Sequence, residues 1–166
     1  MCGIAGEVRT AGLAPRPEGF YEKALATMAR RGPDQEGMFR SEGCVLLHRR
    51  LAVIDPDRGR QPMTMGPYTL VYNGELYNTE DLRRELIAQG MEFEGHSDTE
   101  VLLKAYLRWE DRAVEMLNGI FAFAVYNEKT RRLFLARDPM GVKPLFYAQR
   151  GDLFFFASDR KSTRLN

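Results

Sequence analysis

Apolar residues recur along this chain in two kinds of pattern: short runs bounded by turn residues, and positions spaced by three or four. Short runs rich in β-branched and aromatic residues are typical of strands, and the wider spacing is typical of amphipathic helices. The runs predict strands over about residues 2–8, 44–48, 51–54, 68–72, 119–126, 132–137, 145–148 and 153–157. The spaced positions predict helices that begin near residues 17, 79 and 97, with further helical turns within 111–117.

Two local motifs sharpen this pattern. Ser97-Asp98-Thr99-Glu100 matches a capping box, in which the first side chain bonds a backbone N–H of the helix that follows. Asn73-Gly74 stands between the run 68–72 and residues 75–78, and this dipeptide is a strong hairpin signal. We therefore expect a helix to start after Ser97 and a tight turn to form at Asn73-Gly74.

The order of these elements indicates an α+β fold. Helices gather in the middle of the chain and paired strands dominate both ends, which favours mainly antiparallel sheets. The run 119–126 is apolar almost throughout, with alanines between larger side chains, as expected of a strand covered on both faces. We therefore expect two sheets facing each other, with helices on the outside.

Composition narrows the possible functions. The chain has 166 residues, of which 44% are hydrophobic and 28% charged, and this fits one globular domain. Its net charge of +1 gives no electrostatic reason to expect nucleic acid or an anionic membrane as a partner. No apolar stretch approaches the ~20 residues of a membrane helix, and no secretory signal opens the chain. A cytoplasmic location is expected.

The few cysteines and histidines argue against a metal centre. Cys2 and Cys44 are too few for a disulfide framework, and we expect Cys44 in the core. His48 and His96 lack metal-ligand spacing with either cysteine, so no metal site is predicted. We expect His48 to be a buried strand residue. The chain also lacks a P-loop.

Cys2 is the most suggestive single residue, because it follows the initiator methionine directly. Removal of that methionine would leave a thiol with a pKa of about 8.5 and an α-amine with a pKa of about 8 on one residue. An N-terminal amine can activate such a nucleophile. The alternative is a small hydrophobic residue that opens a buried strand.

Several blocks of sequence occur in the order found in one enzyme family. These blocks are Met1-Cys-Gly-Ile-Ala-Gly6, Arg31-Gly-Pro-Asp34, Arg50-Leu-Ala-Val-Ile-Asp55, Tyr72-Asn-Gly-Glu-Leu-Tyr-Asn78, Ser97-Asp-Thr-Glu-Val101, Asn118-Gly-Ile-Phe-Ala-Phe123 and Arg137-Asp-Pro-Met-Gly141. Together they resemble the N-terminal glutaminase half of glutamine-hydrolysing asparagine synthetases. The resemblance implies the four-layer αββα sandwich of N-terminal-nucleophile glutamine amidotransferases.

The resemblance also implies catalytic roles. Cys2 would attack the side-chain amide of glutamine, form a thioester and release ammonia, after which water would release glutamate. The Asn73 side chain and the Gly74 backbone N–H would stabilise the oxyanion. Taken alone, Asn73-Gly74 is an ordinary turn, and only Cys2 makes the catalytic interpretation preferable.

Four further residues would bind glutamine. The resemblance assigns its α-carboxylate to Arg50, with Arg49 as the competing residue, and part of the pocket wall to the backbone of Val53. Asp98, helped by Glu75, would bind the α-ammonium group. Asp98 also suits a helix N-terminus electrostatically, and both roles are compatible.

Complete members of the family continue into a synthetase domain that binds ATP and magnesium. The resemblance therefore implies that residues 1–159 form the ammonia-supplying glutaminase domain, without a cofactor of its own, and that a covalently linked synthetase domain is missing here. Residues 160–166 depart from the family pattern, and we expect a non-native or truncated tail there.

Two other functions stay open at this stage. The chain could be a non-catalytic module that binds glutamine for a partner. It could also be the amidotransferase domain of an envelope- or peptide-modifying enzyme with the same N-terminal half.

Overall fold

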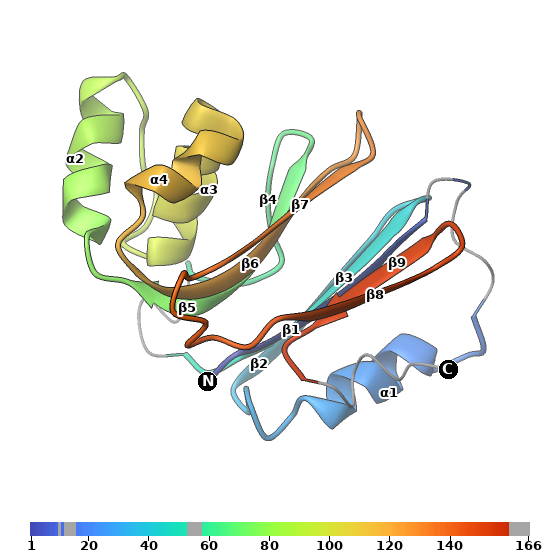
Figure 1. Cartoon of the computed structure of the whole chain (residues 1–166). Helices are drawn as coiled ribbons and strands as arrows, with labels where there is room; N and C mark the ends of the chain where they lie inside the picture. Colours follow the sequence, from blue (N-terminus) through green and yellow to red (C-terminus); the bar gives the residue numbers. More distant parts are fainter. Residues whose placement is uncertain (10, 12–15, 53–57, 160–166) are drawn as a thin grey trace.

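The computed structural model describes residues 1–9, 11, 16–52 and 58–159. Two β-sheets face each other in it, and helices cover the outer face of each sheet (Figure 1). This is the four-layer arrangement that the sequence predicted. Residues 160–166, for which a tail was predicted, lie outside the described residues.

The sheets contain all the described strands, and every neighbouring pair is antiparallel. The five-stranded sheet has the order β2 (Gln35–Arg40), β3 (Cys44–Arg50), β1 (Gly3–Arg9), β9 (Leu153–Ala157) and β8 (Phe146–Arg150). The four-stranded sheet has the order β4 (Met63–Met65), β5 (Tyr68–Leu76), β6 (Gly119–Asn127) and β7 (Arg132–Arg137). Both ends of the chain thus contribute to one sheet.

The helices divide between the two outer faces. They are α1 (Phe20–Thr27), α2 (Thr79–Ala88), α3 (Asp98–Trp109), the 3₁₀ turn η1 (Glu110–Arg112) and α4 (Ala113–Met116). Figure 1 shows α1 against the five-stranded sheet and the other helices against the four-stranded sheet. None of them is long and apolar enough to span a membrane.

Strand β6 shows how the layers form. Phe121 and Phe123 belong to the core under α2 and α3, whereas Ala122 and Ala124 belong to the core between the sheets. Because side chains alternate along a strand, the alanines let the two sheets approach while the phenylalanines fill the space below the helices. The prediction of a strand covered on both faces is confirmed.

The capping box prediction is confirmed in part. The Ser97 hydroxyl accepts a hydrogen bond from the Glu100 backbone N–H at 3.3 Å, so α3 begins where the sequence indicated. The Glu100 carboxylate instead accepts from the N–H groups of Glu94 and Gly95 and pairs with Lys104. The cap therefore also fixes the loop that leads into α3.

The hairpin predicted at Asn73-Gly74 is wrong. Strand β5 continues through both residues and pairs with β6 from Tyr68 to Leu76. Nine consecutive pairs with β6 outweigh the local turn preference of Asn-Gly. A Cβ at Gly74 would lie 2.4 Å from the Ile120 carbonyl oxygen, so glycine serves close strand packing there rather than a turn.

Other strand predictions also need correction. The edge strands β2 and β4 were missed, because their short sequences lack a clear apolar alternation. The strand predicted over residues 51–54 is not present at Leu51 and Ala52, which follow the end of β3 without strand structure, and the rest of that segment lies outside the described residues. Helix α1 begins at Phe20, three residues after the predicted start.

Candidate active site

A pocket of about 220 Å³ collects most of the predicted site residues. Its lining consists of Met1, Cys2, Arg50, Leu51, Gln61, Tyr72, Asn73, Gly74, Glu75, Asp98, Thr99 and Lys143. Six of the seven predicted residues are therefore together, although they come from β3, β5, α3 and, for Cys2, the residue just before β1. Val53, the seventh, lies outside the described residues.

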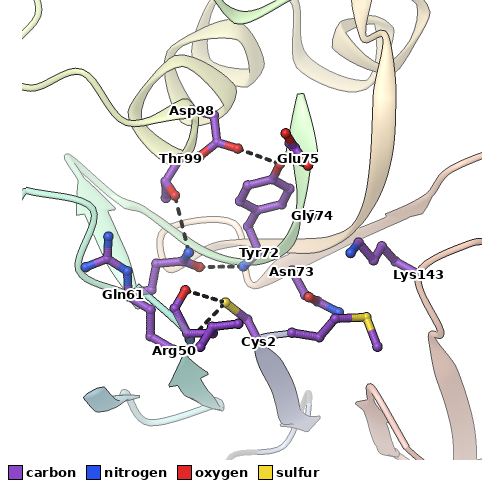
Figure 2. A pocket seen from close by; sticks show the side chains of 12 residues that line it. Cys2, Arg50, Gln61, Tyr72, Asn73, Gly74, Glu75, Asp98, Thr99 and Lys143 are labelled. Carbon is purple, nitrogen blue, oxygen red and sulfur yellow. Dashed lines mark hydrogen bonds between the residues drawn. The ribbon is translucent and has the colours of Figure 1, made fainter. Parts of the chain in front are cut away.

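Cys2 is half-buried directly before β1 and faces this pocket (Figure 2). Its Sγ lies 3.4 Å from the backbone N of Leu51, which donates to it, and 3.7 Å from the Leu51 carbonyl oxygen. Burial raises the pKa of the Cys2 thiol, while the Leu51 backbone, the chain's terminal ammonium and Arg50 act in the opposite direction. Burial, with a smaller contribution from Asp98, outweighs these groups, so the pKa of Cys2 is raised and the protonated thiol is favoured in the resting site.

The turn before β2 fixes the segment that contacts Cys2. The Asp34 N–H donates to the Arg50 carbonyl at 3.0 Å, and the Asp34 carboxylate accepts from the Ala52 N–H at 2.8 Å. Gly32 allows this turn to lie against β3, since a Cβ there would be 2.3 Å from the Arg49 carbonyl carbon. These contacts hold Leu51, and with it the immediate surroundings of the sulfur.

Cys44 provides the contrast. It is fully buried in the core between the sheets, and burial raises its pKa far above the ordinary value. This confirms the prediction that Cys44 belongs to the core. Of the two thiols, Cys2 is the one that lines the pocket.

The second half of β5 presents backbone groups to the pocket. Neighbouring residues of an antiparallel pair alternate between bonding the partner strand and facing away from it. Tyr77 donates to Asn118, and the Phe121 N–H and carbonyl bond Asp138 instead of β5. Gly74, which pairs with Phe121, therefore directs its N–H away from β6 and toward the pocket edge.

Asn73 directly precedes Gly74 on β5 and lines the same pocket. It is 1% exposed, and its Nδ2 has no hydrogen-bond partner among the described residues. A buried amide nitrogen without a partner is costly, at about 1–3 kcal/mol. Since Asn73 lines the pocket, a ligand there could accept this hydrogen bond.

Asp98 occupies the opposite wall, at the first position of α3. The Tyr72 hydroxyl donates to its Oδ2 at 2.9 Å. Burial is the main influence on this carboxyl and raises its pKa, although the hydrogen bonds from Tyr72 and from backbone N–H groups lower it. Glu75, also predicted, is exposed at the same pocket.

Two cations complete the lining. Arg50 is buried at the end of β3 and donates from Nη1 to the Gln35 side chain at 2.9 Å. Lys143 extends toward the pocket from the side opposite Gln61 (Figure 2). With Asp98 and Glu75, the pocket offers charges of both signs to one small ligand. This suits a zwitterionic amino acid.

Besides Met1 and Leu51, which adjoin Cys2 and Arg50 in the chain, four lining residues were missed by the sequence reasoning: Gln61, Tyr72, Thr99 and Lys143. Tyr72 and Thr99 stood inside predicted elements next to predicted site residues, so their neighbours pointed to them. Gln61 and Lys143 come from loops, and no sequence pattern distinguishes them. His48, expected as a buried strand residue, is fully buried, and it does not line this pocket.

Comparison with known proteins agrees with this geometry. The family model described as a glutamine amidotransferase domain matches residues 1–165. The chain belongs to this family. It is a glutamine amidotransferase domain. The two antiparallel sheets with outer helices confirm the predicted α+β fold class.

The most similar curated proteins include asparagine synthetases. Asparagine synthetase [glutamine-hydrolyzing] 3 of Bacillus subtilis is 48% identical over 98% of this chain, and the chain covers 27% of that protein. The probable asparagine synthetase of Dictyostelium discoideum is 39% identical over 99% of this chain, with 30% of its own length covered. The chain thus spans less than a third of these relatives.

A solved structure shows the same fold. Glutamine phosphoribosylpyrophosphate amidotransferase from Bacillus subtilis matches 99% of this chain with a TM-score of 0.78 and 23% sequence identity. The chain covers 43% of that protein. The two-sheet architecture is therefore shared between amidotransferases of different overall length.

Proposed function

We propose that this amidotransferase domain hydrolyses glutamine to glutamate and ammonia through a thioester on Cys2. One observation carries the proposal: the thiol of Cys2 lines the same pocket as Asn73, Gly74, Arg50 and Asp98. A nucleophile, candidate oxyanion donors and both charges needed for an amino-acid head group thus surround one cavity.

Before the enzyme can react, the initiator Met1 is removed, and this leaves a free α-amine on Cys2. That amine accepts the thiol proton as Sγ attacks the side-chain amide carbon of glutamine. The tetrahedral intermediate expels the amide nitrogen, which takes the proton and leaves as ammonia. Water then attacks the thioester carbonyl, which yields glutamate and restores the thiol.

The oxyanion of each tetrahedral intermediate is assigned to Asn73 and Gly74. The buried Asn73 Nδ2 has no hydrogen-bond partner in the part of the chain that the structure describes, and the Gly74 N–H faces the pocket edge of β5. Both donors are fixed by the strand before the substrate arrives, which is what electrostatic stabilisation of a transition state requires.

The α-carboxylate of glutamine is assigned to Arg50 and its α-ammonium group to Asp98, with Glu75 at the exposed side of the pocket. A guanidinium matches the planar geometry of a carboxylate. A carboxylate has about four acceptor sites, so Asp98 can bind the ligand in addition to the Tyr72 hydroxyl and the backbone N–H groups that already bond it. The proposed backbone contact from Val53 belongs to the same subsite.

Ammonia release from glutamine by the purified domain tests this proposal. Cys2→Ala should abolish release, whereas Cys44→Ala should retain it, because Cys44 is buried in the core between the sheets. Intact-mass measurement should show that the active protein lacks Met1. Activity that survives Cys2→Ala, or full activity with Met1 retained, would contradict the mechanism.

We further propose that the domain supplies ammonia to a covalently linked synthetase domain that makes asparagine from aspartate with ATP and magnesium. The support is the match to asparagine synthetases, of which the chain covers under a third. The domain itself would need no cofactor, and a cytoplasmic location would follow from these substrates.

The full-length protein provides the test. It should form asparagine with either glutamine or free ammonia as the nitrogen source. Cys2→Ala should lose only the glutamine-dependent reaction. A product other than asparagine would point to a different acceptor for the ammonia.

A further inference from the structure

We infer that Gln61 and His48 are positioning residues that hold the Tyr72 peptide from its open edge and so fix the oxyanion donors that follow it. This inference rests on the proposed function. It begins from the unequal pairing of β5. Strand β6 pairs with all of β5, whereas β4 pairs only with Tyr68–Leu70.

Beyond Leu70, the second edge of β5 has no neighbouring strand among the described residues. Unpaired buried backbone groups cost free energy, and sheets usually satisfy them with another strand. At Tyr72 two side chains take that place. The Tyr72 N–H donates to Gln61 Oε1 at 2.6 Å, and its carbonyl accepts from His48 Nε2 at 3.0 Å.

Gln61 is itself fixed by contacts on two other sides. Its Nε2 donates to the Thr99 hydroxyl at 3.3 Å, next to Asp98 on α3. Its backbone lies against β2, where a Cβ at Gly37 would be 2.1 Å from the Gln61 carbonyl oxygen. Gln61 therefore connects the five-stranded sheet, the edge of β5 and the start of α3 (Figure 2).

His48 reaches Tyr72 from β3, across the space between the sheets. It is fully buried, and burial lowers its pKa to about 4, so the ring is neutral near pH 7. A neutral ring that bonds a carbonyl through Nε2 carries its proton there. Because His48 does not line the pocket, it acts through Tyr72 rather than on a ligand.

We call the two hydrogen bonds from Gln61 and His48 to the Tyr72 backbone the clamp. The clamp matters because Asn73 and Gly74 follow Tyr72 directly in β5. Gly74 presents the next N–H on the same edge, and this one faces the pocket. With Tyr72 held at both its N–H and its carbonyl, the donors cannot shift along or away from the edge. A displacement of about 1 Å in such groups can cost 10²-fold in rate.

Gln61→Met tests the clamp, because it keeps the length of the side chain and removes both hydrogen bonds. We expect kcat for glutamine hydrolysis to fall about 10- to 100-fold, with KM changing less than about threefold. Gln149→Met, at an exposed position on β8, is the matched control and should keep wild-type kinetics. Unchanged kcat in folded Gln61→Met would overturn the inference.

A pair of His48 variants independently tests the hydrogen bond to the Tyr72 carbonyl. His48→Gln can still donate to the Tyr72 carbonyl and should retain most of kcat, whereas His48→Leu should lose kcat as Gln61→Met does. Equal activity of the two folded His48 variants would overturn the positioning role. Inactivity of the wild-type protein would instead refute the proposed function, so the two failures are distinguishable.

Binding provides a readout that does not depend on turnover. An aldehyde analogue of glutamine forms a tetrahedral adduct with a thiol and needs the oxyanion donors, whereas glutamate needs only the head-group contacts. Gln61→Met should weaken inhibition by the aldehyde about tenfold or more and leave inhibition by glutamate within about threefold. Equal weakening of both would show a general structural defect and would contradict the clamp.

Discussion

The two halves of β5 have the same backbone conformation and different surroundings. From Tyr68 to Leu70 the strand lies between β4 and β6, and its backbone groups are used by the sheet. From Tyr72 onward β6 is the only described strand that pairs with it, and the other edge meets Gln61, His48 and the pocket. One half is ordinary sheet, and the other lines the pocket.

The comparison shows how an antiparallel sheet can supply rigid hydrogen-bond donors without a loop. Strand β4 ends opposite Leu70, so one edge of β5 beyond this residue has no described strand beside it. Strand β6 continues to pair with the other edge of β5. Side chains satisfy the first exposed peptide, and the next N–H on that edge, that of Gly74, bonds no strand among the described residues. The site thus gains the rigidity of the sheet together with free donors, which is the arrangement expected for oxyanion stabilisation.

The largest loss of activity is expected from adding a side chain to β5 beyond Tyr72, where β4 no longer pairs with it. In Gly74→Ala the Cβ would lie 2.4 Å from the Ile120 carbonyl oxygen and 2.8 Å from the Phe121 Cα, so the backbone must shift. We expect glutaminase activity to fall about 10³-fold or more, and stability to fall by about 1–3 kcal/mol. Ammonia release and chemical denaturation measure the two effects.

Gly66→Ala is the control for that variant, because Gly66 precedes the paired half of the strand. Its φ of 57° disfavours alanine, but no atom lies within 4 Å of the added Cβ. It should cost about 1 kcal/mol of stability and keep its activity. Similar activity losses in both variants would erase the distinction between the two halves.

Asn73→Ala should give the next largest effect. Its Nδ2 bonds no other described group, so removing it should leave stability nearly unchanged, while kcat falls about 10²- to 10³-fold. Asn78→Ala should show the reverse, because Asn78 bonds the Met116 carbonyl and the Asn118 N–H. It should lose about 1–3 kcal/mol of stability with kcat retained. A stability loss in Asn73→Ala without a kcat loss would contradict the assignment.

The His48 side of the clamp predicts a pH effect on stability. Burial lowers the pKa of His48 to about 4 from its ordinary 6.5. Between these values the unfolded chain binds more protons than the folded protein does, so the free energy of unfolding should decrease as pH falls from 6.5 to 4. The loss should approach about 3 kcal/mol, from 1.36 kcal/mol per pKa unit.

Comparison with His48→Gln isolates this effect, since the raised pKa of Asp98 acts in the opposite direction and is present in both proteins. Denaturation curves at several pH values should show a steeper dependence in the wild-type protein. Parallel pH dependences would mean that His48 is protonated in the folded state.

The smallest effect is expected in the paired half. Thr64 and Thr69 face each other across β4 and β5, with 3.0 Å between their hydroxyl oxygens. Thr64→Val should lower stability by about 0.2–1 kcal/mol and leave both kcat and KM unchanged. A clear change in kcat would show that the two halves are coupled, and it would weaken the comparison.

Helix α3 and strand β6, whose signals lie within a short stretch of sequence, were predicted correctly. Helix α3 starts after Ser97 because its cap lies within four residues, and β6 is apolar along its whole length because both of its faces are covered. The site residues Cys2 and Asp98 could be proposed from the sequence because family motifs include them.

What the tertiary structure alone decided is the environment of β5. The local preference of Asn73-Gly74 for a turn is worth little against a full ladder with β6, and that ladder joins residues about 50 apart in the chain. The roles of Gln61, Tyr72 and His48 likewise depend on an open strand edge that exists only after the two sheets have assembled. The sequence by itself predicted the layers and pointed to Cys2 as the proposed nucleophile, whereas long-range strand pairing determined which backbone groups of β5 bond no other strand among the described residues.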